Sequence, residues 1–149
     1  MKSLRLFACL AALALVPSTA ALAQQPANPQ QKQPPKEEKT FPKDSNWTLR
    51  SLNGKPVPAG MEATLHIDNQ FRGAGFAGCN TFSATMWPVR GQHFAVGGIA
   101  VTKKSCPPAA MQFEQAYLRA LFAGPTWDIV GGLLEVKSQA GSLSFSRGL

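Results

Sequence analysis

The chain has 149 residues, of which 44% are hydrophobic and 15% are charged, and its 15 Lys and Arg against 8 Asp and Glu give a formal net charge of +7. This length and composition suit one small domain with additional polar sequence. The basic residues are not gathered into a patch or stripe, which argues against a nucleic-acid-binding protein.

The first 23 residues have the three parts of a secretory signal peptide. Residues 1–5 are basic, residues 6–16 are apolar, and residues 21–23 form a small-residue cleavage signal. The apolar run spans about 11 residues, whereas a transmembrane helix needs roughly 20. We therefore predict cleavage after Ala23, export to the periplasm or the medium, and no membrane span. Cys9 lies inside the apolar run, in a poor match to a lipid-attachment motif, and we expect it to leave with the signal peptide.

Residues 24–45 are rich in proline, glutamine and lysine, and Phe41 is their only large apolar residue. Such a segment buries too little surface to offset the entropy lost on ordering. We predict a disordered tether, acting as a spacer in preference to a proline-rich ligand for another domain. The folded domain is then expected over 46–149. It is only mildly basic, which allows a weak attraction to anionic lipids or envelope polymers.

The first half of the expected domain has the alternation of β-strands. Asn53-Gly54 is a strong signal for a two-residue hairpin turn. Gly73, Gly75 and Gly78 leave little side chain in their region, which indicates a bulge or a close approach of two backbones. The predicted strands are 47–52, 62–67, 71–76, 82–89 and 93–101.

An amphipathic helix is predicted over 109–123, because this stretch is rich in good helix formers and follows two prolines. Gly124-Pro125 ends it. Its apolar face is made of Ala110, Phe113, Tyr117, Ala120 and Leu121. Three short strands are predicted next, over 126–130, 133–136 and 142–146. This order of elements indicates an α+β fold, a curved antiparallel sheet or half-open barrel packed against one α-helix.

Two cysteines remain after export, and an oxidising compartment favours a disulfide between Cys79 and Cys106. A closed loop of about 28 residues contributes about 3.6 kcal/mol in the chain-entropy model. The alternative is a redox-active pair. It is disfavoured because the chain has no Cys-x-x-Cys motif and no neighbouring histidine to lower a thiol pKa.

Short motifs in a fixed order resemble one family of small domains. They are Trp47 to Val57, Gly78-Cys79-Asn80, Thr102 to Cys106, the helix residues Glu114, Tyr117, Leu118 and Leu121, and the closing segments 133–134 and 142–145. In this order they are similar to the META domain, also called HslJ-like. Lys104 stands where that family usually has methionine, which affects the packing of that loop.

The resemblance implies an exported or envelope-associated protein without established catalytic activity. Members of the family are linked to heat-shock response and antibiotic tolerance, or to motility and secretion. We therefore expect a monomeric, non-enzymatic envelope protein that binds a partner protein or surface during stress. The alternative is a small-molecule carrier or hydrolase with its site inside the curved sheet, which a large apolar pocket would favour.

The polar residues themselves suggest no active site. His66 and His93 have no third ligand at a metal-binding spacing, so we expect no metal and no cofactor. Asp68 and Asp128 flank turns, where short carboxylates usually accept backbone N–H groups. Glu114 lies in the first turns of the helix, where we expect it to accept backbone N–H bonds or to complement the helix dipole. We therefore expect no catalytic residue.

Four residues besides the cysteine pair have an expected role. Gly78 and Asn80 are predicted to form a structural turn beside the disulfide, with Asn80 buried in preference to pointing into a binding pocket. Ser105 lacks the context of a nucleophile and is expected to be a loop residue. Trp87 precedes a proline in a strand–turn region and is the first candidate for a contact with a partner.

Overall fold

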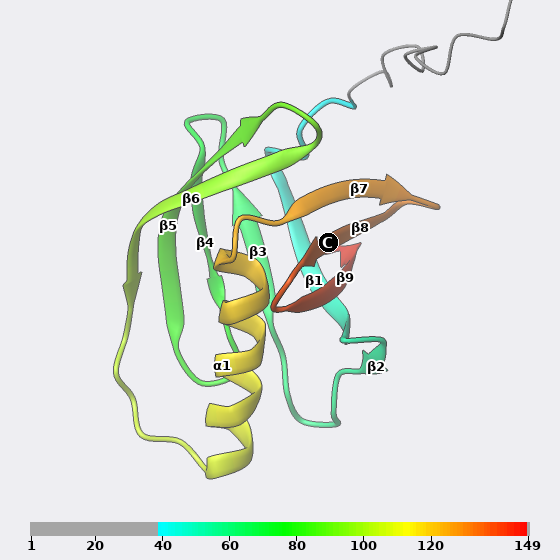
Figure 1. The fold of residues 1–149 in the computed structure, drawn as a ribbon. Coiled ribbons are helices and arrows are strands. Elements are labelled where there is room, and N and C mark those ends of the chain that lie inside the picture. Colours follow the sequence, from blue (N-terminus) through cyan, green and yellow to red (C-terminus); the bar gives the residue numbers. More distant parts are fainter. Residues whose placement is uncertain (1–38, 149) are drawn as a thin grey trace, which may run out of the picture. The chain divides into compact units, whose positions relative to one another are not determined.

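The computed structural model describes residues 39–148, and Figure 1 shows a β-barrel with one helix alongside it. The signal peptide and residues 24–38 of the expected tether lie outside this described part. The elements are β1 (Ser45–Leu52), β2 (Lys55–Pro56), β3 (Thr64–Ile67), β4 (Arg72–Phe76), β5 (Thr81–Val89), β6 (His93–Val101), α1 (Pro108–Phe122), β7 (Thr126–Val130), β8 (Leu133–Ser138) and β9 (Gly141–Arg147).

The sheet closes on itself, because the last strand pairs with the first. The order is β2-β1-β3-β4-β5-β6-β7-β8-β9 with an additional β1–β9 pairing, so eight strands form the ring. The two-residue strand β2 pairs with the end of β1. Leu49 lies opposite Phe145 in the closing pair. The expectation of a curved sheet or half-open barrel is corrected here to a closed barrel. The shortest strand pairing in the barrel is that of β6 with β7, which consists of the single pair His93–Thr126.

Alternate residues of the strands point into the barrel and fill it, as the period of two predicts. Trp47, Leu65, Met86, Leu143 and Phe145 are each at most 1% exposed. The glycines of β4 allow the wall to pack closely: a Cβ on Gly73 would collide with the side chain of Met86, and one on Gly75 with the Thr64 carbonyl. The predicted close approach of two backbones is therefore confirmed.

Helix α1 covers one end of the barrel, where β3 and β5 begin and β4 ends (Figure 1). Its buried face is made of Phe113, Tyr117, Ala120 and Leu121, as the apolar stripe predicts. The Tyr117 hydroxyl donates a hydrogen bond of 2.9 Å to the Thr64 carbonyl. Complete burial raises the pKa of Tyr117. No helix in residues 39–148 is both long and apolar enough to cross a membrane.

The opposite end of the barrel is covered by residues 39–44, which we call the strap. The strap lies over the end of β3 and the starts of β4 and β6, and we call this end of the barrel the barrel mouth. Phe41 is only 9% exposed and belongs to the hydrophobic core. The folded part of the chain therefore begins before Asn46, where we expected it to start. One aromatic residue among polar neighbours is too weak a sequence signal to show this, because its burial depends on the pocket that receives it.

Candidate functional site

Cys79 and Cys106 form a disulfide, which confirms the predicted pairing. Their Cα atoms are 6.1 Å apart. The bond joins the turn between β4 and β5 to the loop that leads into α1. It therefore fixes the N-terminal end of the helix against the barrel.

Asn80 is the centre of a hydrogen-bond network beside the disulfide. Its side chain is buried, and its Oδ1 accepts bonds from Thr102 Oγ1 (2.8 Å) and from the backbone N of Lys104 (2.7 Å). Its Nδ2 and its backbone N donate to the two carboxylate oxygens of Glu114, at 3.1 and 2.7 Å. Glu114 thus links the helix to the turn. The network therefore joins the loop before α1 and the helix itself to the turn between β4 and β5.

Gly78 completes this turn for a steric reason. Its φ of 95° lies in the left-handed region, and a Cβ at this position would lie 2.6 Å from Cδ1 of Phe113. Any other residue would be strained here and would displace the helix. The Gly-Cys-Asn motif is therefore a docking turn for α1.

The expected contact residue Trp87 is 40% exposed on β5. Val89 on the same strand and Ile99 on β6 are also large exposed apolar residues. Trp87 lies beside Gly97, whose missing side chain leaves the ring uncovered. The β5–β6 hairpin therefore presents apolar surface to solvent.

The candidate ionisable residues stay apart from one another. His66 Nδ1 lies 3.3 Å from the Ser45 carbonyl, and Asp68 accepts bonds from the backbone and side chain of Arg72. The backbone N–H of Arg72, followed by its guanidinium, lowers the pKa of Asp68. His93 lines a surface cleft of about 500 Å³ at the β6–β7 seam, together with Thr126 and Lys137. Within residues 39–148 no three His, Cys, Asp or Glu residues gather as metal ligands.

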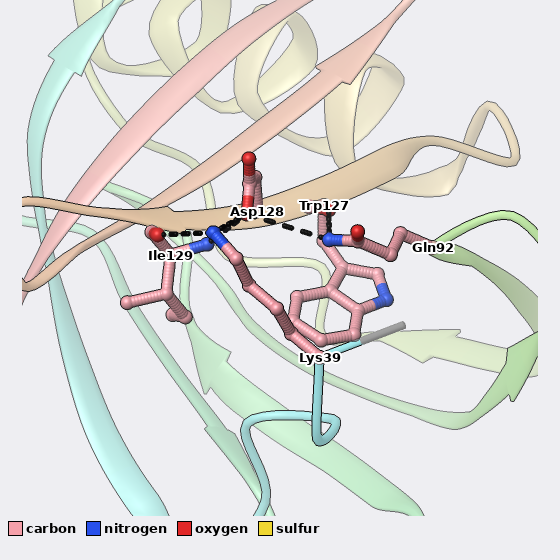
Figure 2. Close-up of polar contacts among 5 residues, drawn as sticks. All are labelled: Lys39, Gln92, Trp127, Asp128 and Ile129. Atoms are coloured by element: carbon pink, nitrogen blue, oxygen red, sulfur yellow. Dashed lines mark hydrogen bonds and ion pairs between the residues drawn. The ribbon is translucent and has the colours of Figure 1, made fainter. Parts of the chain in front are cut away.

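The barrel mouth joins five residues that sequence reasoning did not bring together (Figure 2). Lys39 Nζ forms an ion pair with Asp128 Oδ1 and donates to the Ile129 carbonyl at 2.8 Å. Asp128 Oδ1 also accepts from the backbone N of Ile129 at 2.8 Å and from Gln92 Nε2 at 3.4 Å. The hydrogen bond from Lys39 is the main cause that lowers the pKa of Asp128.

Three aromatic rings of the barrel receive Phe41. Its ring centroid lies 5.4 Å from that of Trp127, 6.0 Å from Phe94 and 6.3 Å from Phe71, with edge-to-face or tilted geometry. Aromatic pairs favour such arrangements at these separations. We call Phe71, Phe94 and Trp127 the aromatic box.

The aromatic box contains one polar atom without a partner. Trp127 is 4% exposed, and its Nε1 has no hydrogen-bond acceptor among the residues that the structure describes. Buried donors are nearly always paired, so an orphaned one marks a place where a ligand or an ordered water fits. The only sequence signal for this site was the lysines on either side of Phe41.

The described part of the chain is therefore a small antiparallel β-barrel protein with one helix covering an end of the barrel. The chain belongs to the META domain family, which matches residues 40–147. An NMR structure of a protein from Burkholderia xenovorans is 23% identical and covers 91% of this chain and 99% of its own, with a TM-score of 0.60. A second NMR structure is 21% identical and covers 68% of this chain and 87% of its own, with a TM-score of 0.58. These two likenesses show the fold alone. A search of curated proteins finds no match.

Proposed function

We propose that this META-domain protein is an exported, non-enzymatic protein of the cell envelope that acts by binding a partner protein or surface. The observation that carries this proposal is the filled barrel. Bulky side chains occupy the interior, α1 covers one end, and Phe41 occupies the other. A barrel packed in this way offers its surface for binding, whereas a carrier of small molecules needs an interior cavity.

The state of the carboxylates supports binding over turnover. Asp68 and Asp128 each accept two or more hydrogen bonds from the protein. A carboxylate held in this way is stabilised as the anion and is poorly suited to taking up a proton. The alternative of a hydrolase with a site inside the sheet has no observation in its favour.

The family resemblance adds the setting, which is envelope stress or antibiotic tolerance. The basic, apolar and small-residue parts of residues 1–23 support export. The exposed Trp87, Val89 and Ile99 supply apolar surface to which a partner could bind.

Affinity capture from envelope extracts tests the proposal. The exported chain should retain a specific partner that a Trp87→Ala variant retains less well, with Thr85→Ala on the same strand as the matched control. A growth defect under heat or antibiotic stress should follow deletion of the protein. Loss of that protection in a folded His66→Gln, His93→Gln or Asp68→Asn variant that still captures the partner would contradict the non-enzymatic proposal.

A further inference from the structure

The barrel residues at the mouth are held by contacts with one another as well as by the strap. Asp128 Oδ1 is oriented by the backbone N of Ile129 and by Gln92 Nε2. Gln92 Nε2 also donates to the Trp127 backbone carbonyl at 3.1 Å. The backbone carbonyl of Gln92 accepts from the backbone N of Trp127 at 2.7 Å. Gln92 has a φ of 54°, a conformation that bulky residues rarely adopt. The acceptor site is therefore preorganised by β7 and the β5–β6 turn.

This preorganised site matches a short basic and aromatic peptide. Asp128 Oδ1 and the Ile129 carbonyl provide two acceptors for one ammonium group, as Figure 2 shows. The aromatic box holds the ring of Phe41, two residues after Lys39. The strap then turns at Pro42, where the backbone N of Lys43 donates to the Phe41 carbonyl at 2.9 Å.

Two further contacts bind the strap at Pro42 and Lys43. Trp47 Nε1 donates to the Pro42 carbonyl at 3.4 Å, and Lys43 Nζ lies 5.4 Å from the centroid of the Phe71 ring. The occupied site therefore recognises the sequence Lys-x-Phe-Pro-Lys by charge, ring and backbone together. Recognition of an extended segment by pockets for alternate side chains is a common mode of peptide binding.

The strap precedes the barrel strands and is joined to β3 by the hydrogen bond of 2.7 Å from the backbone N of Asp44 to the Ile67 carbonyl. Strand β1 begins at Ser45, after Asp44 with its φ of 54°. The ion pair that fixes the start of the strap is open to water, because the side chains of Lys39 and Asp128 are 46% and 35% exposed. Exposed pairs are weak and are screened by salt. The strap can therefore leave the mouth while the ladder from β1 to β9 remains intact.

We propose that the barrel mouth is a recognition site for a partner protein that presents an exposed Lys-x-Phe-Pro segment, and that the strap occupies this site in cis until the partner displaces it. The inference rests on the proposed binding function and names the partner chemistry.

Peptide titration of the full chain tests the proposal. The double variant Lys39→Ala/Phe41→Ala removes both anchors of the strap, and the probe is the blocked pentapeptide Lys-Thr-Phe-Pro-Lys. Binding is followed by tryptophan fluorescence and by the indole N–H resonance of Trp127. We expect the double variant to bind the probe at least tenfold more tightly than the unaltered chain does, because the strap no longer competes.

Two altered peptides and one variant with a reversed charge at Asp128 serve as matched controls. Replacing the phenylalanine of the probe by alanine, or its first lysine by glutamate, should weaken binding at least tenfold. Adding Asp128→Lys to the double variant should reverse the charge preference in favour of the glutamate peptide. Phe41→Ala alone, which empties the aromatic box and keeps Lys39, provides a second background should the double variant fail to fold. Absence of binding to both backgrounds, or equal binding of the alanine peptide, would overturn the proposal.

Failure of this inference can be told apart from failure of the proposed function. Capture from envelope extracts by the unaltered chain, undiminished in an Asp128→Lys variant, would leave the binding function standing and remove the mouth as its site. A dimer of the unaltered chain that the double variant loses would show that a second copy, and not a separate partner, fills the mouth. That result would also overturn the proposal.

Discussion

The two ends of the barrel are closed by different means. At the helical end a disulfide, the Asn80 network and the buried face of α1 act together. At the barrel mouth the strap is held by the Phe41 ring, by the exposed Lys39–Asp128 ion pair, by Lys43 against Phe71, and by hydrogen bonds from Trp47 to the Pro42 carbonyl and from Asp44 to the Ile67 carbonyl. The contrast indicates that the helical end is a permanent part of the fold, whereas the mouth is covered by a segment that can exchange.

The permanence of the helical end follows from cooperation among its parts. The disulfide limits the freedom of the unfolded chain, and Glu114 satisfies two donors of Asn80 that would otherwise be buried without partners. Removal of one part therefore leaves the others strained or unpaired. At the mouth, removal of the strap exposes apolar surface and removes the Lys39–Asp128 bond, whereas the hydrogen bonds of Gln92 with Asp128 and Trp127 involve no strap residue.

The largest effect is expected from the disulfide. Cys79→Ser/Cys106→Ser should lower the free energy of unfolding by about 2–5 kcal/mol, because the unfolded chain regains the entropy of the closed loop. Urea unfolding of the exported protein, with and without reductant, measures the loss. A variant whose stability matched that of the unaltered protein would show that the helical end does not depend on the bond.

Asn80→Ala should cost about 2–3 kcal/mol, because the hydrogen bonds of its buried amide to Thr102, Lys104 and Glu114 are lost. Thr81→Ala, at the exposed neighbouring position, is the control and should cost under about 0.5 kcal/mol. The two variants are compared by the midpoint of urea unfolding at an unchanged m-value. Equal midpoints would mean that water replaces Asn80 and that the network is dispensable.

Phe41→Ala should have a smaller effect, about 1–2 kcal/mol. The lost burial of a ring is partly offset by the chain entropy that the freed strap regains. Phe41→Leu, which retains apolar volume, should fall between this variant and the unaltered protein. Thermal unfolding provides the measurement. A loss as large as that of Asn80→Ala would contradict the contrast between the two ends.

The smallest effect is expected from lowering the pH, which protonates Asp128 and weakens the hold on the strap. Ion pairing with Lys39 lowers the pKa of Asp128 in the folded protein, so its contribution is fully present above the ordinary aspartate pKa of about 3.9 and is lost as the pH falls through the lowered value. NMR resonances of the strap should therefore shift towards free-chain positions below about pH 4. Asp128→Asn should remove this pH dependence. Strap resonances that do not change down to pH 2 would show that the ion pair plays no part.

Much of the helical end could be predicted from the sequence. The disulfide follows from the two cysteines that remain after the expected signal peptide, and the helix expected over 109–123 is observed over Pro108–Phe122. The strand expected over 93–101 is observed over His93–Val101. These features depend on local composition and periodicity, which a single sequence displays directly. The partners of Asn80 could not be predicted, because they come from loop and helix residues far along the chain.

The sequence alone determined the elements, the disulfide and the family, since each rests on residue type and spacing within short segments. Tertiary structure decided the closure of the barrel and the position of the strap. Closure requires β1 and β9 to meet from opposite ends of the domain, and neither strand carries a local signal for its partner. Likewise, Phe41 becomes a core residue only because Phe71, Phe94 and Trp127 converge around it from separate strands and turns, and that convergence exists only in the folded chain.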